Sequence, residues 1–403
     1  MSRAAPHPAV YSVLYFPFGA LGGFVAVALT FLGTKHGLSI TESSFLGAAQ
    51  LCISYLKWMW APAVDITLNP KRWYWIAVGT SAVAAVALAS IPLSQETLPL
   101  MIAIVAAGAV VNSVVGMAVE SLMAAATPAD QQGKVGGWFQ VGNLGGYGVG
   151  GGLGLVLLER LEHPWIAGAA LGCSFLLCGL GLNFLPSPKA HHREGGIVAA
   201  LQGVGSDIGG LAKSKGGLLA AILCFLPVGT GAAQGVLTQA EVAATWGAGA
   251  NQVAILQGVL AGVIMAVGCL AGGWICDRVH PRMAYAAVGI VLALMAIGMS
   301  ISPLTITMFV TWSMLYSFGV GIAYTAFTAT VLNAMGTGSA ATKYNLYASL
   351  SNFPIWWLGL LLAWVADNYG ATQMLQAEAV LGVLGVAVFA IATSQVQRSK
   401  LPG

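Results

Sequence analysis

The stretch Asp65-Ile-Thr-Leu-Asn-Pro-Lys71-Arg72 closes the second long apolar run of the chain, and Asp277-Arg278-Val-His-Pro-Arg282 closes the eighth. The two aspartates stand about 212 positions apart. In each copy an apolar helix ends at a carboxylate, the chain turns through a proline, and basic residues start the next helix. The repetition predicts a chain made of two related halves, and duplicated six-helix halves are typical of membrane transporters.

The composition of the chain indicates a lipid rather than an aqueous surrounding. Of 403 residues, 58% are hydrophobic and 7% are charged, whereas soluble chains carry roughly 25% charged residues. The 53 glycines agree, because small residues let membrane helices approach closely. The six cysteines lie in or at the ends of apolar runs without Cys-x-x-Cys or Cys/His spacing. We therefore expect no disulfide, no metal, no cofactor and no nucleic-acid partner.

Apolar runs of roughly 20 residues give the predicted membrane spans. The first half holds them near 10–32, 43–65, 73–92, 98–124, 135–158 and 164–185, and the second near 217–241, 252–276, 283–301, 304–332, 342–366 and 372–394. The prediction is an all-α integral membrane protein with 12 transmembrane helices in two pseudo-symmetric six-helix bundles. The bundles cover residues 1–185 and 216–403, with a cytoplasmic linker at 186–215.

Basic residues are distributed unequally between the predicted loops. Lys71, Arg72, Arg278, Arg282 and most other Lys and Arg residues fall on one side, against Lys35 and Arg160 on the other. Cytoplasmic loops are rich in Lys and Arg, so both termini are expected to be cytoplasmic. The first apolar run is long enough to remain as a span rather than to be cleaved. We expect a multi-pass monomer in a bacterial-type cytoplasmic (inner) membrane, with the lipid bilayer as its surroundings.

Two ionisable residues lie deep inside predicted spans. Lys57 precedes Asp65 by about 12 Å of helix, and Glu120 lies at a similar depth ahead of Pro128. Charges inside a membrane usually face the bundle interior and pair, so Lys57 and Glu120 are predicted to form an ion pair with a functional role. The alternative is that Lys57 reaches toward the inner surface while Glu120 helps two helices pack.

The segment Lys57-Trp58-Met-Trp60-Ala-Pro62-Ala-Val-Asp65 resembles the Lys-x-x-Trp-x-Pro-x-x-Asp signature of the peptide/acetyl-coenzyme A transporter branch of the major facilitator superfamily. This branch includes the AmpG-type muropeptide permeases. The resemblance implies that Glu120 is the acidic residue of the fourth helix. The permeases read Asp-Ala-Tyr-Arg-x-Glu there, whereas this chain reads Glu120-Ser-Leu-Met-Ala-Ala, so muropeptide specificity does not follow. Residues 133–147 also resemble the region of this branch that leads from the inner loop into the fifth helix. The Asp277/Arg278 turn resembles the general loop motif of the superfamily.

The two hairpins are interpreted as gates. A carboxylate at the end of one helix can pair with basic residues of the neighbouring hairpin, or cap the positive N-terminus of a helix from the other half. The alternative is that these charges mark topology and turn chemistry. The predicted gating residues are Asp65, Lys71, Arg72, Asp277, Arg278 and Arg282.

The solute site is expected near the membrane midplane, where neutral amides and aromatic rings predominate. Its candidates, some of which would serve only in helix packing, are Trp58, Trp60, Gln140, Asn143, Tyr147, Gln234, Gln239, Gln257, Tyr324, Asn345, Asn352 and Trp356. A phosphate-rich solute would want a cluster of basic residues, and a cationic drug would want acids beside aromatic rings. With Lys57 as the deep cation and Glu120 as the single deep acid, a neutral or singly charged sugar-peptide, glycoside or siderophore-like solute fits best.

These observations predict a secondary active transporter that imports a polar small solute by alternating access, coupled to H⁺. Burial favours a neutral carboxyl, so Glu120 would take a proton when it separates from Lys57. The alternatives are a proton-driven exporter or multidrug efflux protein, an acyl-coenzyme A transporter, and a non-transporting sensor on the same fold. No span contains a central histidine, and clustered catalytic groups are lacking, so an enzyme is not expected.

Overall fold

The computed structural model describes residues 6–186, 196–237 and 239–399. No strand occurs in these ranges, and nine of their helices are long and apolar enough to cross a membrane. A tenth crossing results if Gly196–Lys213 and Lys215–Phe225, bent by 84°, form one span. The all-α, multi-pass prediction is confirmed. The nine spans are Ala9–Lys35, Pro70–Ser90, Leu98–Ala126, Ala129–Arg160, Pro164–Phe184, Pro281–Ile301, Ile306–Met335, Ala340–Tyr369 and Ala371–Arg398.

Three of the predicted spans, the second, seventh and eighth, are not among these nine. The second consists of α3 (Ile40–Leu56), a 3₁₀ turn (Lys57–Met59) and α4 (Ala61–Ile66). Pro62, in the first turn of α4, has no amide hydrogen to donate to the preceding turn, and its ring excludes a continuous helix. The sequence prediction treated this span as one uninterrupted helix, which is wrong.

The seventh and eighth predicted spans are also interrupted. The seventh consists of α11 (Lys215–Phe225), α12 (Ala232–Leu237) and α13 (Ala240–Ala244). Between α11 and α12 lie Pro227 and two glycines with positive φ, Gly229 at +62° and Gly231 at +68°, which together end the helix. The eighth consists of α14 (Ala250–Ile255), a π-helical segment (Leu256–Leu260) and α15 (Ala261–Cys276).

The chain divides into two compact units. Each unit includes one short segment from a stretch of sequence that otherwise belongs to the other unit. Unit 1 comprises Met1–Pro128, Val141–Val204 and Thr337–Asn345, and unit 2 comprises Ala129–Gln140, Gly205–Gly336 and Leu346–Gly403. The linker helix α10 (Gly196–Lys213) is shared between them, and residues 187–195 of the predicted linker lie outside the described ranges. The division at 1–185, 186–215 and 216–403 stays a prediction.

The exchanged segments are the first turns of two long helices. Helix α7 (Gln132–Gln140) belongs to unit 2, although its continuation through Val141–Gly145 into α8 (Gly146–Arg160) belongs to unit 1. Conversely, α18 (Ala340–Tyr369) begins in unit 1 and continues in unit 2. Each unit therefore contains the start of a helix whose remainder belongs to the other.

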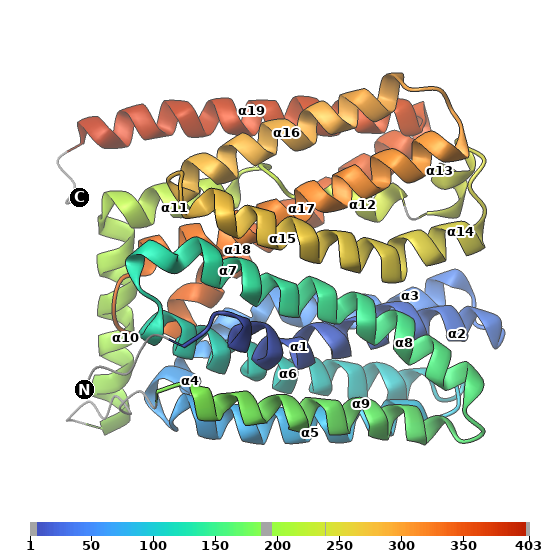
Figure 1. Ribbon diagram of the computed structural model, residues 1–403, viewed down its shortest axis with the longest axis horizontal. Helices are drawn as coiled ribbons and strands as arrows, with labels where there is room; N and C mark the ends of the chain where they lie inside the picture. Colours follow the sequence, from blue (N-terminus) through green and yellow to red (C-terminus); the bar gives the residue numbers. More distant parts are fainter. Residues whose placement is uncertain (1–5, 187–195, 238, 400–403) are drawn as a thin grey trace. The chain divides into compact units, whose positions relative to one another are not determined.

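In unit 1, α1 (Ala9–Gly23) and α8 lie side by side with their backbones in contact (Figure 1). A Cβ atom at Gly23 would lie 1.8 Å from the Tyr147 carbonyl oxygen, and one at Gly150 would lie 1.9 Å from that of Ala20. Glycine is required at both positions, as expected where membrane helices pack through small residues. Besides α3 and α4, this unit also contains α2 (Thr30–Lys35), α5 (Pro70–Ser90), α6 (Leu98–Ala126) and α9 (Pro164–Cys178).

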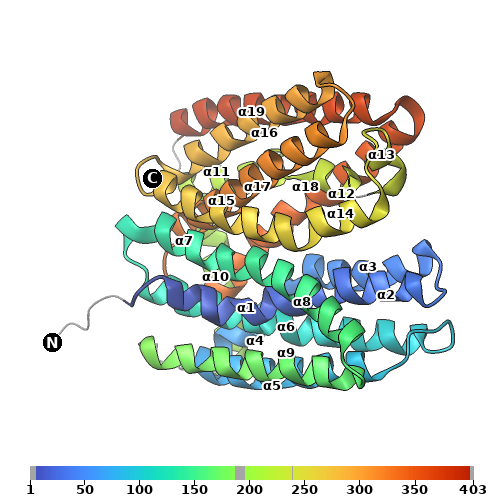
Figure 2. The same ribbon diagram turned by 45° about the vertical axis from the view of Figure 1, so that its right-hand side comes forward.

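Unit 2 has the same kind of packing. Helices α16 (Pro281–Ile301) and α19 (Ala371–Arg398) lie side by side in both views (Figure 2). Helices α15 and α17 (Ile306–Met335) approach closely, since a Cβ atom at Gly268 or Gly321 would lie 2.1 Å from a carbonyl oxygen of the facing helix. Helix α7 packs on α15 through Gly137, where a Cβ atom would lie 2.7 Å from the Cys269 carbonyl oxygen.

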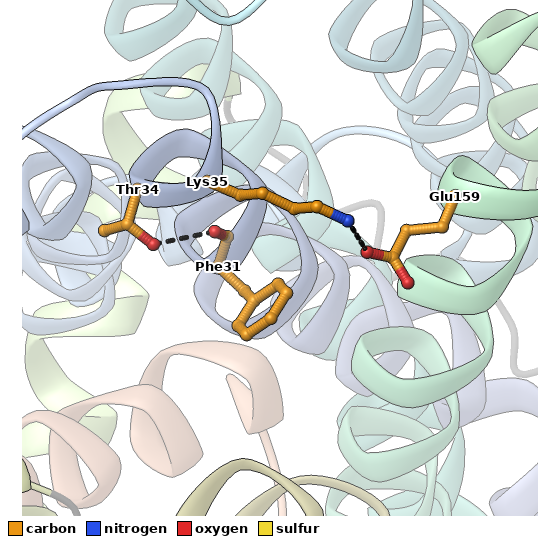
Figure 3. Close-up of polar contacts among 4 residues, drawn as sticks. All are labelled: Phe31, Thr34, Lys35 and Glu159. Atoms are coloured by element: carbon orange, nitrogen blue, oxygen red, sulfur yellow. Dashed lines mark hydrogen bonds and ion pairs between the residues drawn. The ribbon is translucent and has the colours of Figure 1, made fainter. Parts of the chain in front are cut away.

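At the ends of α2 and α8, an ion pair joins two helices of unit 1 (Figure 3). Lys35 Nζ lies 2.6 Å from Glu159 Oε1, and the two side chains are 56% and 34% exposed. The adjacent Thr34 hydroxyl donates to the Phe31 carbonyl oxygen at 2.8 Å. Exposed pairs of this kind contribute about 0–1 kcal/mol. Glu159 therefore serves as an exposed acid with which the buried acids of the protein can be compared.

We predict that Gly150→Ala lowers the stability of the protein. The added methyl group would press into the α1 backbone, and overpacking costs about 1–3 kcal/mol. The matched control is Gly79→Ala on α5, where no heavy atom lies within 4 Å of the added carbon and a gain of about 0.5–1 kcal/mol is expected. Thermal unfolding of both purified variants checks this, and equal melting temperatures would contradict the close packing of α1 and α8.

Candidate functional site

Lys57 lies at the break in the second span, buried in unit 1. It begins the 3₁₀ turn that separates α3 from α4, and its side chain is 7% exposed. The ammonium nitrogen lies 5.9 Å from the centroid of the Phe18 ring, within the range of a cation–π contact. Trp60, at the start of α4, donates from Nε1 to the Ser113 hydroxyl of α6 at 2.8 Å. The break therefore positions a buried cation beside α1 and anchors α4 to α6.

Glu120 is the buried acid of α6 and is 1% exposed. Its Oε2 accepts a hydrogen bond from the Asn345 side-chain amide at 2.6 Å, and its Oε1 accepts one from the Tyr15 hydroxyl at 3.4 Å. The Asn345 amide also donates to the Ala341 carbonyl oxygen at 2.8 Å. The carboxyl group of Glu120 therefore contacts α1 and the first turns of α18, all within unit 1.

The predicted direct ion pair between Lys57 and Glu120 is not formed. The ammonium nitrogen of Lys57 and the carboxyl oxygens of Glu120 do not come within the 4.0 Å of an ion pair. Lys57 and Glu120 still interact electrostatically at longer range. The estimate of equal depth assumed an uninterrupted helix from Lys57 to Asp65, and the helix breaks between them. Phe18 faces the ammonium group instead, and Asn345 and Tyr15 bind the carboxyl group.

Asp65 caps the first turn of α18. Its carboxylate accepts from the backbone amides of Ala341 at 3.0 Å and Thr342 at 2.8 Å, and from the Thr342 hydroxyl at 2.6 Å. The first amides of a helix have no partner within the helix, and a negative charge there is stabilised by the helix dipole. A small apolar cluster of Ala61, Val64, Met117 and Ala341 lies beside the cap. Helices α4, α6 and α18 are thus joined at one point.

Asp277 makes the equivalent contact in unit 2. Its carboxylate accepts from the backbone amides of Gly133 at 2.8 Å and Lys134 at 3.1 Å, at the start of α7. A Cβ atom at Gly133 would lie 2.6 Å from Asp277 Oδ1, so glycine allows the close approach. Burial raises the pKa of Asp277 above its ordinary value, and the two amide hydrogen bonds oppose that rise. The repeated hairpins therefore end in repeated helix caps.

The basic residues of the hairpins make contacts of their own. Lys71 donates from Nζ to the carbonyl oxygens of Leu182 and Leu185 at 2.8 and 2.7 Å, at the end of the sixth span. Arg278 lies over the Trp274 ring of its own helix at 4.1 Å. Arg282 contacts His280 at 3.4 Å, and Arg72 is exposed. Of the two contacts considered for the carboxylates, the structure shows helix capping.

The predicted solute-binding residues fall into three groups. Four make hydrogen bonds within a unit: Trp60 to Ser113, Gln140 to Thr328, Gln234 to Ser317, and Asn345 to Glu120. Three are exposed, namely Trp58, Gln239 and Trp356. Four are partly buried, namely Asn143 and Tyr147 in unit 1 and Tyr324 and Asn352 in unit 2. The side chain of Gln257 lies outside the described part of the chain.

A second buried acid, Glu378 of α19, corrects the prediction that Glu120 is the single deep acid. Glu378 is 8% exposed and accepts hydrogen bonds from the Tyr316 hydroxyl and the Ala233 amide. Its place inside the predicted span 372–394 was a usable signal, because an acid within an apolar run is a candidate site by default. Tyr15 and Phe18 carried no such signal, since aromatic residues are common in apolar helices.

Comparison with known proteins agrees with this architecture. Residues 11–355 match the Major Facilitator Superfamily. The chain belongs to this superfamily. Its members are transporters, so the protein is a multi-pass membrane transporter. The branch resemblance seen in the sequence stays a prediction. No curated protein matches the sequence.

Solved structures share the superfamily fold at low sequence identity. The human organic anion transporter MFSD10 (TETRAN) is 16% identical, with a TM-score of 0.69 over 94% of this chain and 98% of that one. A single-residue variant of the E. coli fucose:proton symporter FucP is 15% identical, with a TM-score of 0.72 over 97% and 98%. The proton:xylose symporter XylE, bound to 6-bromo-6-deoxy-D-glucose, is 15% identical, with a TM-score of 0.66 over 96% and 95%.

We predict that Asp65→Ala exposes the first amides of α18, and that Asp277→Ala exposes those of α7. Loss of a cap costs about 1 kcal/mol, so hydrogen exchange should be about fivefold faster in 340–343 for the first variant and in 132–135 for the second. Mass spectrometry of the exchanged peptides measures both, and each variant is the control for the other. Asp367→Ala, an exposed acid at the far end of α18, should change neither peptide. Unchanged exchange at both helix starts would contradict capping.

Proposed function

We propose that the protein imports a polar small solute by alternating access, coupled to protons through Glu120. The observation that carries this proposal is the hydrogen bond from Asn345 of α18 to the buried Glu120 carboxyl group at 2.6 Å. A carboxylate accepts this bond strongly, whereas the neutral acid accepts it more weakly. Protonation of Glu120 would therefore loosen the first turns of α18.

The gate in this proposal is the capped start of α18. Asp65 binds the amides of Ala341 and Thr342, one helical turn before Asn345, so two carboxyl groups hold the same helix start. Because the Glu120 bond depends on its protonation state, a proton can change how firmly this start is held. Asp277 at α7 supplies the matching cap in unit 2. Release and re-formation of such caps involve small free energies, as a two-state gate requires.

The chemistry of the candidate residues favours a neutral or singly charged solute. Of the twelve candidates, Asn143, Tyr147, Tyr324 and Asn352 are partly buried amides and phenols. Amides and phenols suit hydroxyl-rich solutes with ring faces, whereas several phosphates would want clustered basic groups. Sugar-peptides, glycosides and siderophore-like compounds share this recognition chemistry.

We predict that Glu120→Gln abolishes accumulation against a gradient while facilitated exchange persists. Without a titratable group at this position, protons no longer bind the two transport conformations differently, so a proton gradient cannot drive uptake. The ratio of internal to external solute concentration should then fall to about one. Proteoliposome uptake with an imposed proton gradient measures this ratio. Glu159→Gln removes the exposed acid of the Lys35 pair and should leave accumulation intact. Full gradient-driven accumulation by Glu120→Gln would contradict coupling through Glu120.

The identity of the solute and the direction of its transport are tested on the wild-type protein with a panel of labelled compounds. The panel contains sugar-peptides, glycosides, siderophores, a cationic dye and an acyl-coenzyme A. Gradient-driven accumulation of one of the first three classes supports the proposal. Extrusion of the dye or another compound from loaded vesicles would make the protein an exporter, accumulation of acyl-coenzyme A would overturn the solute class, and no movement of any solute would favour a sensor.

A further inference from the structure

The second buried acid, Glu378, has one carboxyl oxygen that is satisfied and one that is not. Its Oε1 accepts from the Tyr316 hydroxyl of α17 at 2.5 Å and from the Ala233 amide of α12 at 3.1 Å. Its Oε2 is buried and has no hydrogen-bond partner among the described residues. Unsatisfied buried oxygens of a charged group are costly and uncommon. This oxygen is therefore positioned to bind something that the protein itself does not provide.

A small cavity adjoins this carboxyl group. It has room for about one water-sized particle, roughly 10 Å³. Its lining includes Glu378 and Tyr316, Thr230 and the glycines of the interrupted seventh span, and Gly289 and Leu292 of α16. A solute the size of a sugar does not fit. A water molecule or a dehydrated monovalent cation does.

The cavity is next to backbone that is not helical. The residues between Phe225 of α11 and Ala232 of α12 form no helix, and Gly229 and Gly231 have positive φ. The Gly231 carbonyl oxygen accepts from the Gln234 amide of α12 at 3.1 Å, whereas residues 227–230 before it are not part of a helix. In transporters with discontinuous helices, unwound carbonyls of this kind coordinate ions. The Thr230 hydroxyl, which accepts from the Ala232 amide at 3.3 Å, adds another oxygen.

The charges around the site favour a monovalent cation. The described lining contains no Lys, Arg or His, so a carboxylate at Glu378 would be uncompensated there. One negative charge among neutral oxygens balances one positive charge, and hard cations prefer oxygen ligands. A divalent ion would want further carboxylates, and no group of three or more His, Cys, Asp or Glu that could hold a metal occurs among the described residues.

We propose that Glu378, Tyr316 and the unwound segment 227–231 form a binding site for Na⁺ in unit 2, separate from Glu120. The carboxyl Oε2 and the hydroxyl and carbonyl oxygens around the cavity would supply the ligands. The site goes beyond coupling through Glu120 and does not depend on it, because binding requires neither solute nor transport. A transporter with this site would respond to Na⁺ in the absence of solute.

The test is equilibrium binding of ²²Na⁺ to the purified full-length protein at fixed pH and ionic strength, with choline as the replacement cation. We expect saturable binding of about one Na⁺ per chain and a melting temperature about 2–4 °C higher at saturating Na⁺. Glu378→Gln should abolish both effects. Tyr316→Phe, which keeps the ring and removes one oxygen, should weaken binding about fivefold. Glu120→Gln should bind Na⁺ as the wild type does.

Several outcomes would overturn the proposal. They are no saturable Na⁺ binding by the wild type, undiminished binding by Glu378→Gln, or equal loss of binding in Glu120→Gln. Size-exclusion elution verifies that each variant is folded. If Glu378→Gln does not fold, the test rests on Tyr316→Phe. Unweakened Na⁺ binding by that variant, when it is folded, would show that the ion binds elsewhere. A negative result for Na⁺ binding would not contradict proton coupling through Glu120, because that proposal is tested by solute uptake.

Discussion

The first turn of a helix leaves backbone amides without partners, and inside a membrane protein these amides need acceptors from elsewhere in the chain. For α18 and α7 the acceptors are aspartates distant in sequence, Asp65 and Asp277. Each aspartate ends one helix and caps another. Each helix contact therefore combines a charge and a few hydrogen bonds with close packing of the neighbouring apolar residues. In the proposed gate these hydrogen bonds are the part that is broken and remade.

The buried acids give the two units different chemical capacities. Glu120 contributes to the same helix start that Asp65 caps, so a proton on Glu120 acts directly on the proposed gate. Lys57 lies near enough to interact with this carboxyl group electrostatically but too far for a direct ion pair. Glu378 belongs to unit 2, beside interrupted helix and a cavity of about one water volume. The proposed proton site and the proposed cation site can thus be tested independently.

Much of the fold follows from the sequence because lipid enforces simple rules. Long apolar runs must become helices. The repeated Asp65 and Asp277 hairpins left open whether the carboxylates pair with basic residues or cap helices, and the structure shows the caps. The interruptions were harder to predict, since Pro62 and Pro227 break spans whose hydropathy is continuous. The expected Lys57 and Glu120 ion pair failed for that reason: distance along an ideal helix has no meaning across a break. Glu378 was visible as an acid in an apolar run, but its unsatisfied oxygen depends on the tertiary positions of α12 and α17.

The proposed proton coupling requires that the charge of Glu120 control how firmly the start of α18 is held. Hydrogen exchange of residues 340–346, compared between the wild type and Glu120→Gln at one pH, measures that dependence, with residues 132–140 of α7 as the internal reference. We expect faster exchange in 340–346 for the neutral variant and no change in the reference peptide. Identical exchange at the start of α18 in the two proteins would show that the charge of Glu120 does not hold this helix.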